Sequence, residues 1–247
     1  MNSHYAAKLL QDYVNHATVI LSDVMGIGGS AAAPKAKLGK GNHFHSRKRL
    51  VVFTPERLAQ DPSIAVGHEV GHSLHHLVNR EIFRVRNNDR FYVETENAVE
   101  LVANYLAQIF AAYEQALSPN RRMDNLQKVM GDIHRSSGLG QSEEVSFGID
   151  EEKWNALTHD GGYSAAFFLL HRFGGKMAKT LPRLALQDIK ELLTRSGYGL
   201  PLVMSYDRDE SITMYTGDVD ANGNPVLETR LLIASPEPII VRPLPAT

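Results

Sequence analysis

Apolar residues recur every three or four positions in two long stretches of the chain, and this spacing predicts two amphipathic helices. The first spans Tyr5 to Val24 and carries its apolar residues on one stripe. The second spans Tyr92 to Leu117. Ser118 and Pro119 end it, because proline cannot continue a helix.

Between these two helices the sequence pattern predicts a loop, a short strand and a third helix. Met25 to Gly41 is rich in Gly, Ala, Pro and Lys without periodicity, which is typical of a loop. Leu50 to Phe53 is an apolar run with β-branched residues and predicts a strand. Ser63 to Val78 then predicts a helix with Ser63 as its N-cap.

After the second long helix the chain predicts shorter elements. Asn120 to Asp160 is polar and shows only weak helical patterns. Helices are expected at Gly162 to Phe173 and at Ala185 to Thr194. Ile212 to Tyr215 and Val226 to Ile233 predict the two strands of a β-hairpin.

The turn of this hairpin contains Asp218, Asp220, Asn222 and Gly223, at positions that resemble those of a calcium-binding loop. Thr229 stands where such a loop needs a bidentate glutamate, and strands flank the loop where helices should. The pattern favours a plain hairpin and leaves calcium binding open.

The composition is that of an ordinary globular protein: 247 residues, 43% hydrophobic, 22% charged and a net charge of -2. Residues 1–200 are expected to form the main domain, and 201–247 a β-rich extension packed on it.

The absence of cysteine means that a metal must be held by histidine and carboxylate. The polar start from Met1 to Asp12, and the lack of an apolar run near the roughly 20 residues of a membrane span, predict a cytoplasmic protein without membrane contact.

The sequence His68-Glu69-Val70-Gly71-His72 matches the H-E-x-x-H pattern inside a predicted helix. At about 100° per residue the two histidines lie on one face, so both imidazoles can reach one zinc ion. Glu69 lies beside them and can take a proton from a water bound to that metal. The alternative is a histidine-rich surface helix that matches the pattern by chance. Gly67 and Gly71 favour a metal site, because they leave room for a close approach beside it.

A catalytic zinc site needs a third protein ligand. The second long helix offers Glu100, with Glu96 as an alternative, on a stripe that continues into Ala103 and Ala107. Small residues after a carboxylate permit the tight helix packing that a shared metal site requires. The alternative interpretation is two solvated glutamates on an exposed face.

The segment Glu100-Leu-Val-Ala-Asn-Tyr-Leu-Ala107 resembles the E-x-x-A-N-x-F-A glutamate helix of ImmA/IrrE-type metallopeptidases. Their H-E-x-x-H-x-x-x-H pattern also matches His68 through His76. The resemblance covers roughly Leu50 to Leu117. It implies a zincin-like metallopeptidase of the gluzincin group, with Zn²⁺ as cofactor and a protein or peptide as substrate.

By this resemblance His68, His72 and Glu100 would be the zinc ligands and Glu69 the general base. Together with the patterns above, it predicts an α+β, mostly α fold. In that fold a zincin-like core contains a small β-sheet beside the H-E-x-x-H helix, and a β-hairpin lies near the C-terminus.

The segment from Tyr163 to Gly175 is similar to the tyrosine-led helix of aminopeptidase-type gluzincins. Their tyrosine stabilises the oxyanion of the tetrahedral intermediate, which makes Tyr163 a candidate catalytic residue, with His159 as the alternative. A tyrosine packed in the core is the other interpretation. The order Thr158-His-Asp-Gly-Gly-Tyr163 also resembles the T-x-D-x-x-Y part of aspzincins, which makes Asp160 a second choice for the third ligand.

Six basic residues lie between Lys35 and Arg49, and no Asp or Glu occurs between Asp23 and Glu56. Such a basic loop could bind an acidic peptide, although a solvated flap is the commoner case, and nucleic acid is not expected. His43 and His45 could bind metal together if both faced one side of a strand, but they lack an evident third ligand.

Two functions follow as hypotheses. The first is a zinc-dependent metallopeptidase in which Glu69 activates the attacking water. The second is a non-catalytic zinc-containing binding or regulatory protein, whose site would be closed by a fourth protein ligand. His76 and Glu96 are the candidates for that fourth ligand, and His75 is expected at the surface.

Overall fold

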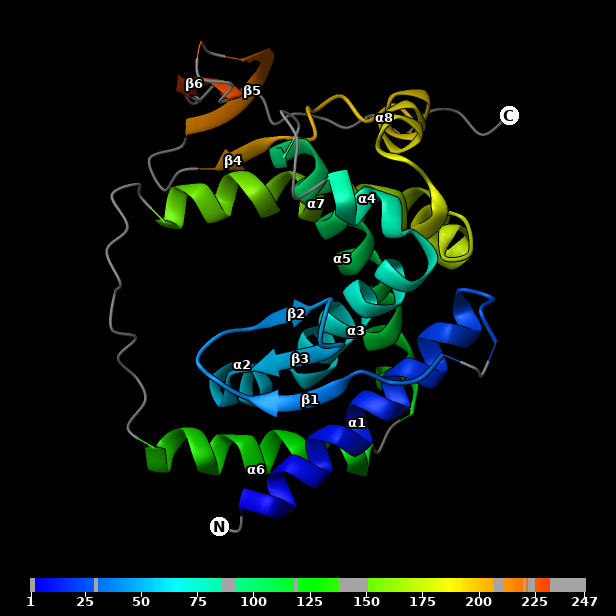
Figure 1. Ribbon diagram of the computed structural model, residues 1–247, viewed down its shortest axis with the longest axis vertical. Helices are drawn as coiled ribbons and strands as arrows, with labels where there is room; N and C mark the ends of the chain where they lie inside the picture. Colours follow the sequence, from blue (N-terminus) through cyan, green and yellow to red (C-terminus); the bar gives the residue numbers. More distant parts are fainter. Residues whose placement is uncertain are drawn as a thin grey trace.

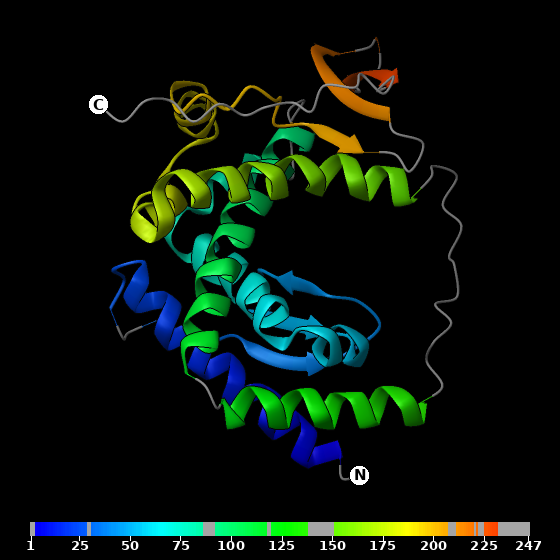
Figure 2. The same ribbon diagram turned by 180° about the vertical axis from the view of Figure 1, so that it is seen from behind.

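The computed structural model describes residues 3–28, 31–85, 92–117, 120–137, 151–206, 211–219, 221 and 225–231. They form a mostly helical α+β fold with a small three-stranded sheet beside α3 and a second small sheet near the end of the described chain (Figures 1 and 2). The fold class predicted from the hydrophobic pattern, α+β and mostly α, is confirmed.

The helices are α1 (Ser3–Val24), α2 (Pro55–Gln60), α3 (Pro62–Val78), α4 (Arg80–Val85), α5 (Tyr92–Ala116), α6 (Arg121–Ser137), α7 (Glu151–Phe173) and α8 (Leu186–Arg195), with 3₁₀ turns η1 (Gly174–Met177) and η2 (Leu181–Arg183). The strands are β1 (Lys35–Leu38), β2 (His43–His45), β3 (Leu50–Phe53), β4 (Met204–Tyr206), β5 (Ser211–Val219) and β6 (Pro225–Leu231).

Periodicity located α1, α5, α8 and β3 to within about two residues at each end, but two other predictions were wrong. The segment predicted as a loop contains β1, which pairs in parallel with β3 and forms only because that partner is present. The helix predicted to start at Gly162 begins at Glu151. Gly161 and Gly162 therefore lie inside this helix and not at its start.

The N-terminus of α3 is capped by Asp61 and not by Ser63 as predicted. The Asp61 side chain accepts a hydrogen bond from the backbone N–H of Ile64, at 3.0 Å, and Pro62 occupies the first helical turn. The Ser63 hydroxyl donates to the same carboxylate at 2.7 Å. The start of the histidine-bearing helix is therefore fixed by three successive residues.

The antiparallel packing of α3 on α5 is built on small residues. A Cβ atom added at Gly67 would lie 3.0 Å from the Cα of Ala107, and one added at Gly71 would lie 3.3 Å from the Cα of Ala103. The two backbones therefore approach closely, as the predicted stripe of small residues on α5 requires. This contact places the histidine face of α3 directly opposite the glutamate face of α5.

The first sheet has the strand order β1-β3-β2, with β1 parallel and β2 antiparallel to β3. Its inner face joins the hydrophobic core, and the residues on it are Ala36, Leu38, Phe44, Val51 and Phe53. α3 packs against the sheet through β2 and β3. The sheet lies in front of α2 and α3 in Figure 1 and behind them in Figure 2.

Helix α7 crosses α5 at a pair of glycines. A Cβ atom at Gly162 would lie 2.3 Å from the carbonyl oxygen of Asn97, and one at Gly161 would lie 1.8 Å from the carbonyl oxygen of Leu202. The Asn97 side chain accepts a hydrogen bond from the Gly162 N–H at 2.8 Å and donates to the carbonyl of Leu157 at 2.6 Å. Only glycine fits at these positions, so the crossing is fixed.

A buried carboxylate ties α1 to the end of α5. Glu114 accepts hydrogen bonds from the Tyr13 hydroxyl and the Asn120 amide, each at 2.8 Å, and its other oxygen lies 2.8 Å from Nε2 of His16. Its carboxylate is fully buried. These bonds hold α1 in place across α5.

Strands β5 and β6 form the antiparallel hairpin predicted from the sequence, and β4 pairs with β5. Residues 220 and 222–224 of the predicted calcium-like turn lie outside the described residues. The division at residue 200 stays a prediction. Within the described part of the chain, no helix has both the length and the apolar character needed to cross a membrane.

Candidate metal centre

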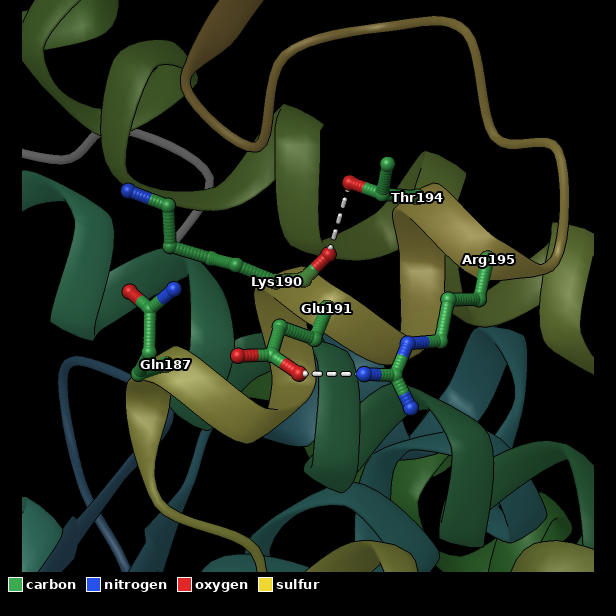
Figure 3. Close-up of a pocket in the computed structure, with 5 residues that line it drawn as sticks. All are labelled: Gln187, Lys190, Glu191, Thr194 and Arg195. Carbon is green, nitrogen blue, oxygen red and sulfur yellow. Dashed lines mark hydrogen bonds and ion pairs between the residues drawn. The ribbon is translucent and has the colours of Figure 1, made fainter.

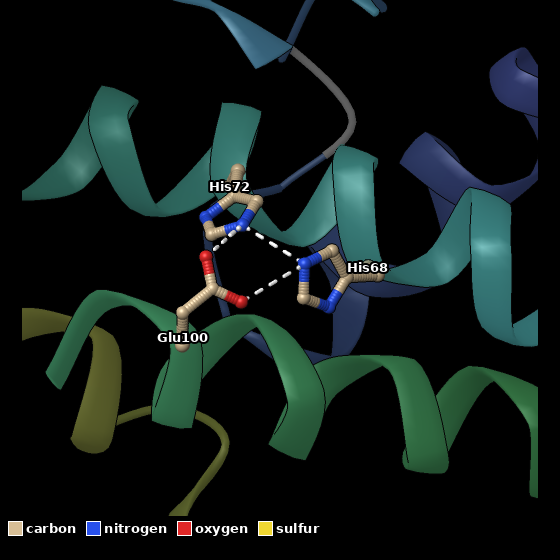
Figure 4. A group of neighbouring side chains, drawn as sticks. All are labelled: His68, His72 and Glu100. Carbon is tan, nitrogen blue, oxygen red and sulfur yellow. Dashed lines mark hydrogen bonds and ion pairs between the residues drawn. The ribbon is translucent and has the colours of Figure 1, made fainter. Parts of the chain in front are cut away.

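His68, His72 and Glu100 converge on one point between α3 and α5 (Figure 4). The two imidazole Nε2 atoms lie 3.0 Å apart. Glu100 places Oε2 at 3.2 Å from Nε2 of His68 and Oε1 at 3.1 Å from Nε2 of His72. The pattern of the sequence predicted that these three residues lie together, and the structure brings them together.

The donor set and its spacing fit a metal ion. A tetrahedral zinc ion bound at about 2.0–2.1 Å needs ligand atoms about 3.3 Å apart. The two Nε2 atoms are 3.0 Å apart, and each has one Glu100 oxygen at 3.1 or 3.2 Å, which is close to that separation. Two imidazoles and one carboxylate are ligands that zinc and neighbouring transition metals accept. The His68–His72–Glu100 group can therefore hold a metal ion and leave coordination positions for other ligands.

Asn104 orients His68 from the side opposite the metal position. Its Oδ1 lies 3.2 Å from Nδ1 of His68, while its Nδ2 donates to the backbone carbonyl of Glu100 at 2.9 Å. Because the amide nitrogen is used by that carbonyl, Oδ1 must accept from an Nδ1–H group. Nε2 of His68 is then the nitrogen with a lone pair available to a metal. The sequence analysis assigned no role to Asn104, although it lies in the motif compared with the glutamate helix.

The charges of the group favour a cation. Burial lowers the pKa of His68, but the Glu100 carboxylate outweighs this effect and raises the pKa to about 9. Burial raises the pKa of Glu100, but His72 and His68 together hold it well below its usual range. In the metal-free site Glu100 is therefore ionised and a proton is retained on His68. A bound metal ion would take the place of that proton.

Glu69 follows His68 on α3 and has only 4% of its surface exposed. Its carboxylate is near enough to His68 to contribute to the raised pKa of that ring. Glu69 is not one of the residues whose ligand atoms form the described group. It is therefore a buried carboxylate near His68 that does not belong to the described ligand group.

His159 on α7 reaches the same group from the opposite helix. Its Nε2 lies 3.7 Å from Oε1 of Glu100, and about half of its side chain is exposed. Tyr163 lies one turn further along α7, is 49% exposed, and contacts Phe167 with ring centroids 4.7 Å apart. Tyr163 is thus not buried in the core. Of the two candidate oxyanion donors, His159 is the one with a contact to the metal-binding residues.

Glu96 and Asp160, the alternative third ligands, do not belong to the group formed by the described residues. Glu96 is 2% exposed and Glu100 is 4% exposed, so the interpretation of two solvated glutamates was wrong. Both side chains face the interior because α5 is covered by α3 on one side and α7 on another.

His75, expected at the surface, is fully buried and packs edge-to-face on Phe83, with ring centroids 5.1 Å apart. His76 packs between Phe44 and Phe83, with centroid distances of 5.9 and 5.0 Å. Burial and the nearby Arg80 and Arg49 lower the pKa of His76. These two histidines of the H-E-x-x-H helix thus contribute to packing.

The pocket drawn in Figure 3 lies along α8 and is lined by Gln187, Lys190, Glu191, Thr194 and Arg195. Glu191 and Arg195 form an ion pair at 3.0 Å, and the Thr194 hydroxyl donates to the carbonyl of Lys190 at 3.0 Å. All five residues come from one helix, and the Lys190 ammonium donates to Glu94 of α5 at 2.8 Å. This pocket brings together no catalytic or metal-binding group.

No family model, curated protein or solved structure matches this chain. The candidate site therefore stands on the geometry of its own residues.

Proposed function

We propose that this protein is a zinc-dependent metallopeptidase of the zincin-like, gluzincin type. The observation that carries the proposal is the arrangement of His68, His72 and Glu100. The two imidazole Nε2 atoms lie 3.0 Å apart, and each lies 3.1 or 3.2 Å from one oxygen of the Glu100 carboxylate. The position of Glu69 beside this group, and the small sheet packed on α3, support it further. Zinc is the metal proposed because the donors are two imidazoles and one carboxylate.

In this proposal the residues have separate tasks. Zinc, when bound, polarises the peptide carbonyl and makes water acidic enough to lose a proton near neutral pH. Glu69 accepts that proton as the general base and later delivers it to the leaving amine. Asn104 keeps His68 in the orientation that presents Nε2.

His159 and Tyr163 are the proposed donors to the oxyanion that develops on the substrate carbonyl. His159 is supported by its position 3.7 Å from Glu100. Tyr163 is supported by its location one turn away on the same helix and by its exposure. Parallel kinetics of His159→Ala and Tyr163→Phe, at equal metal content, would identify the donor by the larger loss of kcat.

The decisive experiment combines metal analysis with peptide hydrolysis for Glu69→Gln. The expected result is a variant that binds as much zinc as wild type but no longer cleaves a fluorogenic peptide library. Glu81→Gln, an exposed glutamate on α4, is the matched control and should keep full activity. A zinc-loaded wild type without any hydrolysis, or a Glu69→Gln variant as active as wild type, would refute the proposal.

The second candidate function is a non-catalytic protein in which the metal site is structural. It is favoured by His159, which could close the site as a fourth ligand if its ring moved toward the metal. An exogenous hydroxamate chelator distinguishes the two functions, because it binds the metal-loaded protein only if a coordination position is open. Tight hydroxamate binding supports the peptidase, and its absence supports the structural site.

A further inference from the structure

The three-stranded sheet has two chemically different faces. Cross-strand partners in a sheet point to the same side, and the register aligns Lys35 with Leu50 and with His45 in one row. The neighbouring row aligns Lys37, Val52 and His43. Both lysines and both histidines are exposed. One face of the sheet is therefore apolar and buried, and the other, which we call the outer face, carries lysine on β1 and histidine on β2, with Leu50 and Val52 of β3 between them.

Further positive charge surrounds this outer face. Lys40 follows β1, and Arg47, Lys48 and Arg49 form the turn between β2 and β3. All four side chains are exposed. The segment from residue 24 to residue 55, which contains the whole sheet, has no Asp or Glu. The positive charge is therefore not neutralised within the segment itself, although the whole chain has a net charge of -2.

The outer face does not line the metal centre. The inner face of the sheet, with Phe44 and Val51, joins the core on the side of α3, which carries His68 and His72. The sheet separates the outer face from that helix (Figures 1 and 2). Helix α1 contacts β1, where the Gln11 side chain accepts from the backbone N–H of Ala36 and donates to the carbonyl of Pro34. The lysines and histidines of the outer face thus lie on the side of the sheet away from α3, whereas Arg49, at the end of the turn between β2 and β3, lies near His76 of α3.

The histidines of the outer face form a close pair. Nε2 of His43 lies 2.9 Å from Nε2 of His45, and the rings meet edge-to-face with centroids 4.5 Å apart. No third ligand joins them among the described residues. The surrounding lysines and arginines would also repel a metal cation. The chemistry of this surface therefore favours an anion.

We propose that the outer face is a docking surface for an acidic segment of another protein. Each of its two rows places a lysine on β1 and a histidine on β2, with an aliphatic residue of β3 between them. An extended chain with several Asp or Glu side chains could lie across these rows. The two phenylalanines of the three strands, Phe44 and Phe53, both face inward. Single-stranded nucleic acid needs aromatic side chains on which bases stack, so an acidic protein segment fits this face better.

The test measures binding of a short fluorescein-labelled Glu-rich peptide to the full chain by fluorescence anisotropy at physiological ionic strength. The test variant is Lys35→Glu/Lys37→Glu, and the control variant is Lys128→Glu/Lys176→Glu, which changes the net charge equally at exposed positions on α6 and η1. Lys35→Gln/Lys37→Gln serves as a milder second variant. Unchanged thermal unfolding of each variant shows that the fold is kept.

The expected result is that the test variant weakens peptide binding by about tenfold or more and the control variant by much less. The milder variant should fall between wild type and the test variant. Absence of peptide binding by wild type, or an equal loss in test and control variants, would overturn the proposal. A single-stranded oligonucleotide that binds wild type more tightly than the peptide would overturn it in favour of nucleic acid. None of these results depends on peptidase activity.

Discussion

Oδ1 of Asn104 on α5 lies 3.2 Å from Nδ1 of His68 on α3, on the side of the ring that faces away from the metal position. The amide is itself held by the carbonyl of Glu100. One ligand-bearing helix therefore orients a ligand on the other. The ring orientation of His68 is thus a property of the α3–α5 pair and not of α3 alone.

Replacement of this amide should weaken metal binding without removing a ligand. Asn104→Ala is expected to lower zinc affinity by about 10- to 100-fold, because His68 loses the acceptor that fixes its ring and tautomer. Competition with a chromophoric chelator measures the affinity. Gln108→Ala, one turn further along α5, is the control and should bind zinc as wild type does. An affinity of Asn104→Ala equal to that of wild type would show that His68 is held by other contacts.

Removal of the proposed third ligand should abolish stable metal binding. Wild type is expected to keep about one zinc ion per chain after dialysis against a mild chelator, and Glu100→Ala to keep none. Glu96→Ala is the control, because Glu96 is equally buried on the same helix but lies outside the ligand group. Elemental analysis gives the metal content. If Glu96→Ala loses zinc and Glu100→Ala keeps it, the assignment of the third ligand is reversed.

The glycine at the α5–α7 crossing should be irreplaceable. The Cβ atom of Gly162→Ala would lie only 2.3 Å from the Asn97 carbonyl oxygen, so the helices must separate. We expect a loss of about 1–3 kcal/mol in the free energy of unfolding. Denaturant titration measures it, with Gly175→Ala as control, since the nearest atom there is 4.0 Å away. Equal stability of the two variants would mean that α7 can shift without cost.

The buried network around Glu114 should make the free energy of unfolding depend on pH in the alkaline range. Burial, followed by the hydrogen bond to Glu114, raises the pKa of Tyr13 above its ordinary value of 10.0. The neutral phenol is therefore favoured in the folded state. This contribution to stability is complete below pH 10.0 and is lost as the pH rises above it, because the unfolded chain then ionises.

Tyr13→Phe is expected to lower the free energy of unfolding by about 1–2 kcal/mol at neutral pH, because the Glu114 carboxylate loses a buried donor. The difference from wild type should shrink above pH 10.0. Chemical denaturation at several pH values measures this, and Tyr5→Phe, at a half-exposed tyrosine of the same helix, is the control. A difference that stays constant with pH would show that Tyr13 ionises equally in both states.

The periodic and motif-bearing parts of this protein could be predicted from the sequence, and the contacts between distant segments could not. Spacing predicted that His68 and His72 share one face of α3. Glu100 was predicted from the stripe on α5 that continues into small residues, and the family resemblance favoured it over Glu96. The small residues Ala103 and Ala107 indicated the close approach of α5 to α3, and the structure has this approach. The local sequence pattern therefore predicted the candidate ligands and the two helices on which they lie.

Three features depended on partners that a pattern does not reveal. Strand β1 forms because β3 lies beside it, although its own residues, Lys35 to Leu38, suggest a loop. Glycine is required at positions 161 and 162 of α7 because a second backbone passes close to each of them. The contact of His159 with Glu100 exists because that crossing brings α7 to α5. Each of these depends on tertiary packing, which overrides local preference.

The glycine and alanine contacts between α3 and α5 also govern how a metal would enter the site. The helix axes cannot move closer, since Gly67 and Gly71 already meet the backbone of Ala107 and Ala103. The distance between the histidine and glutamate donors is therefore set during folding, before any ion arrives. Metal uptake should then need only local movements of side chains, and the chain should adopt the same helical structure with and without its ion.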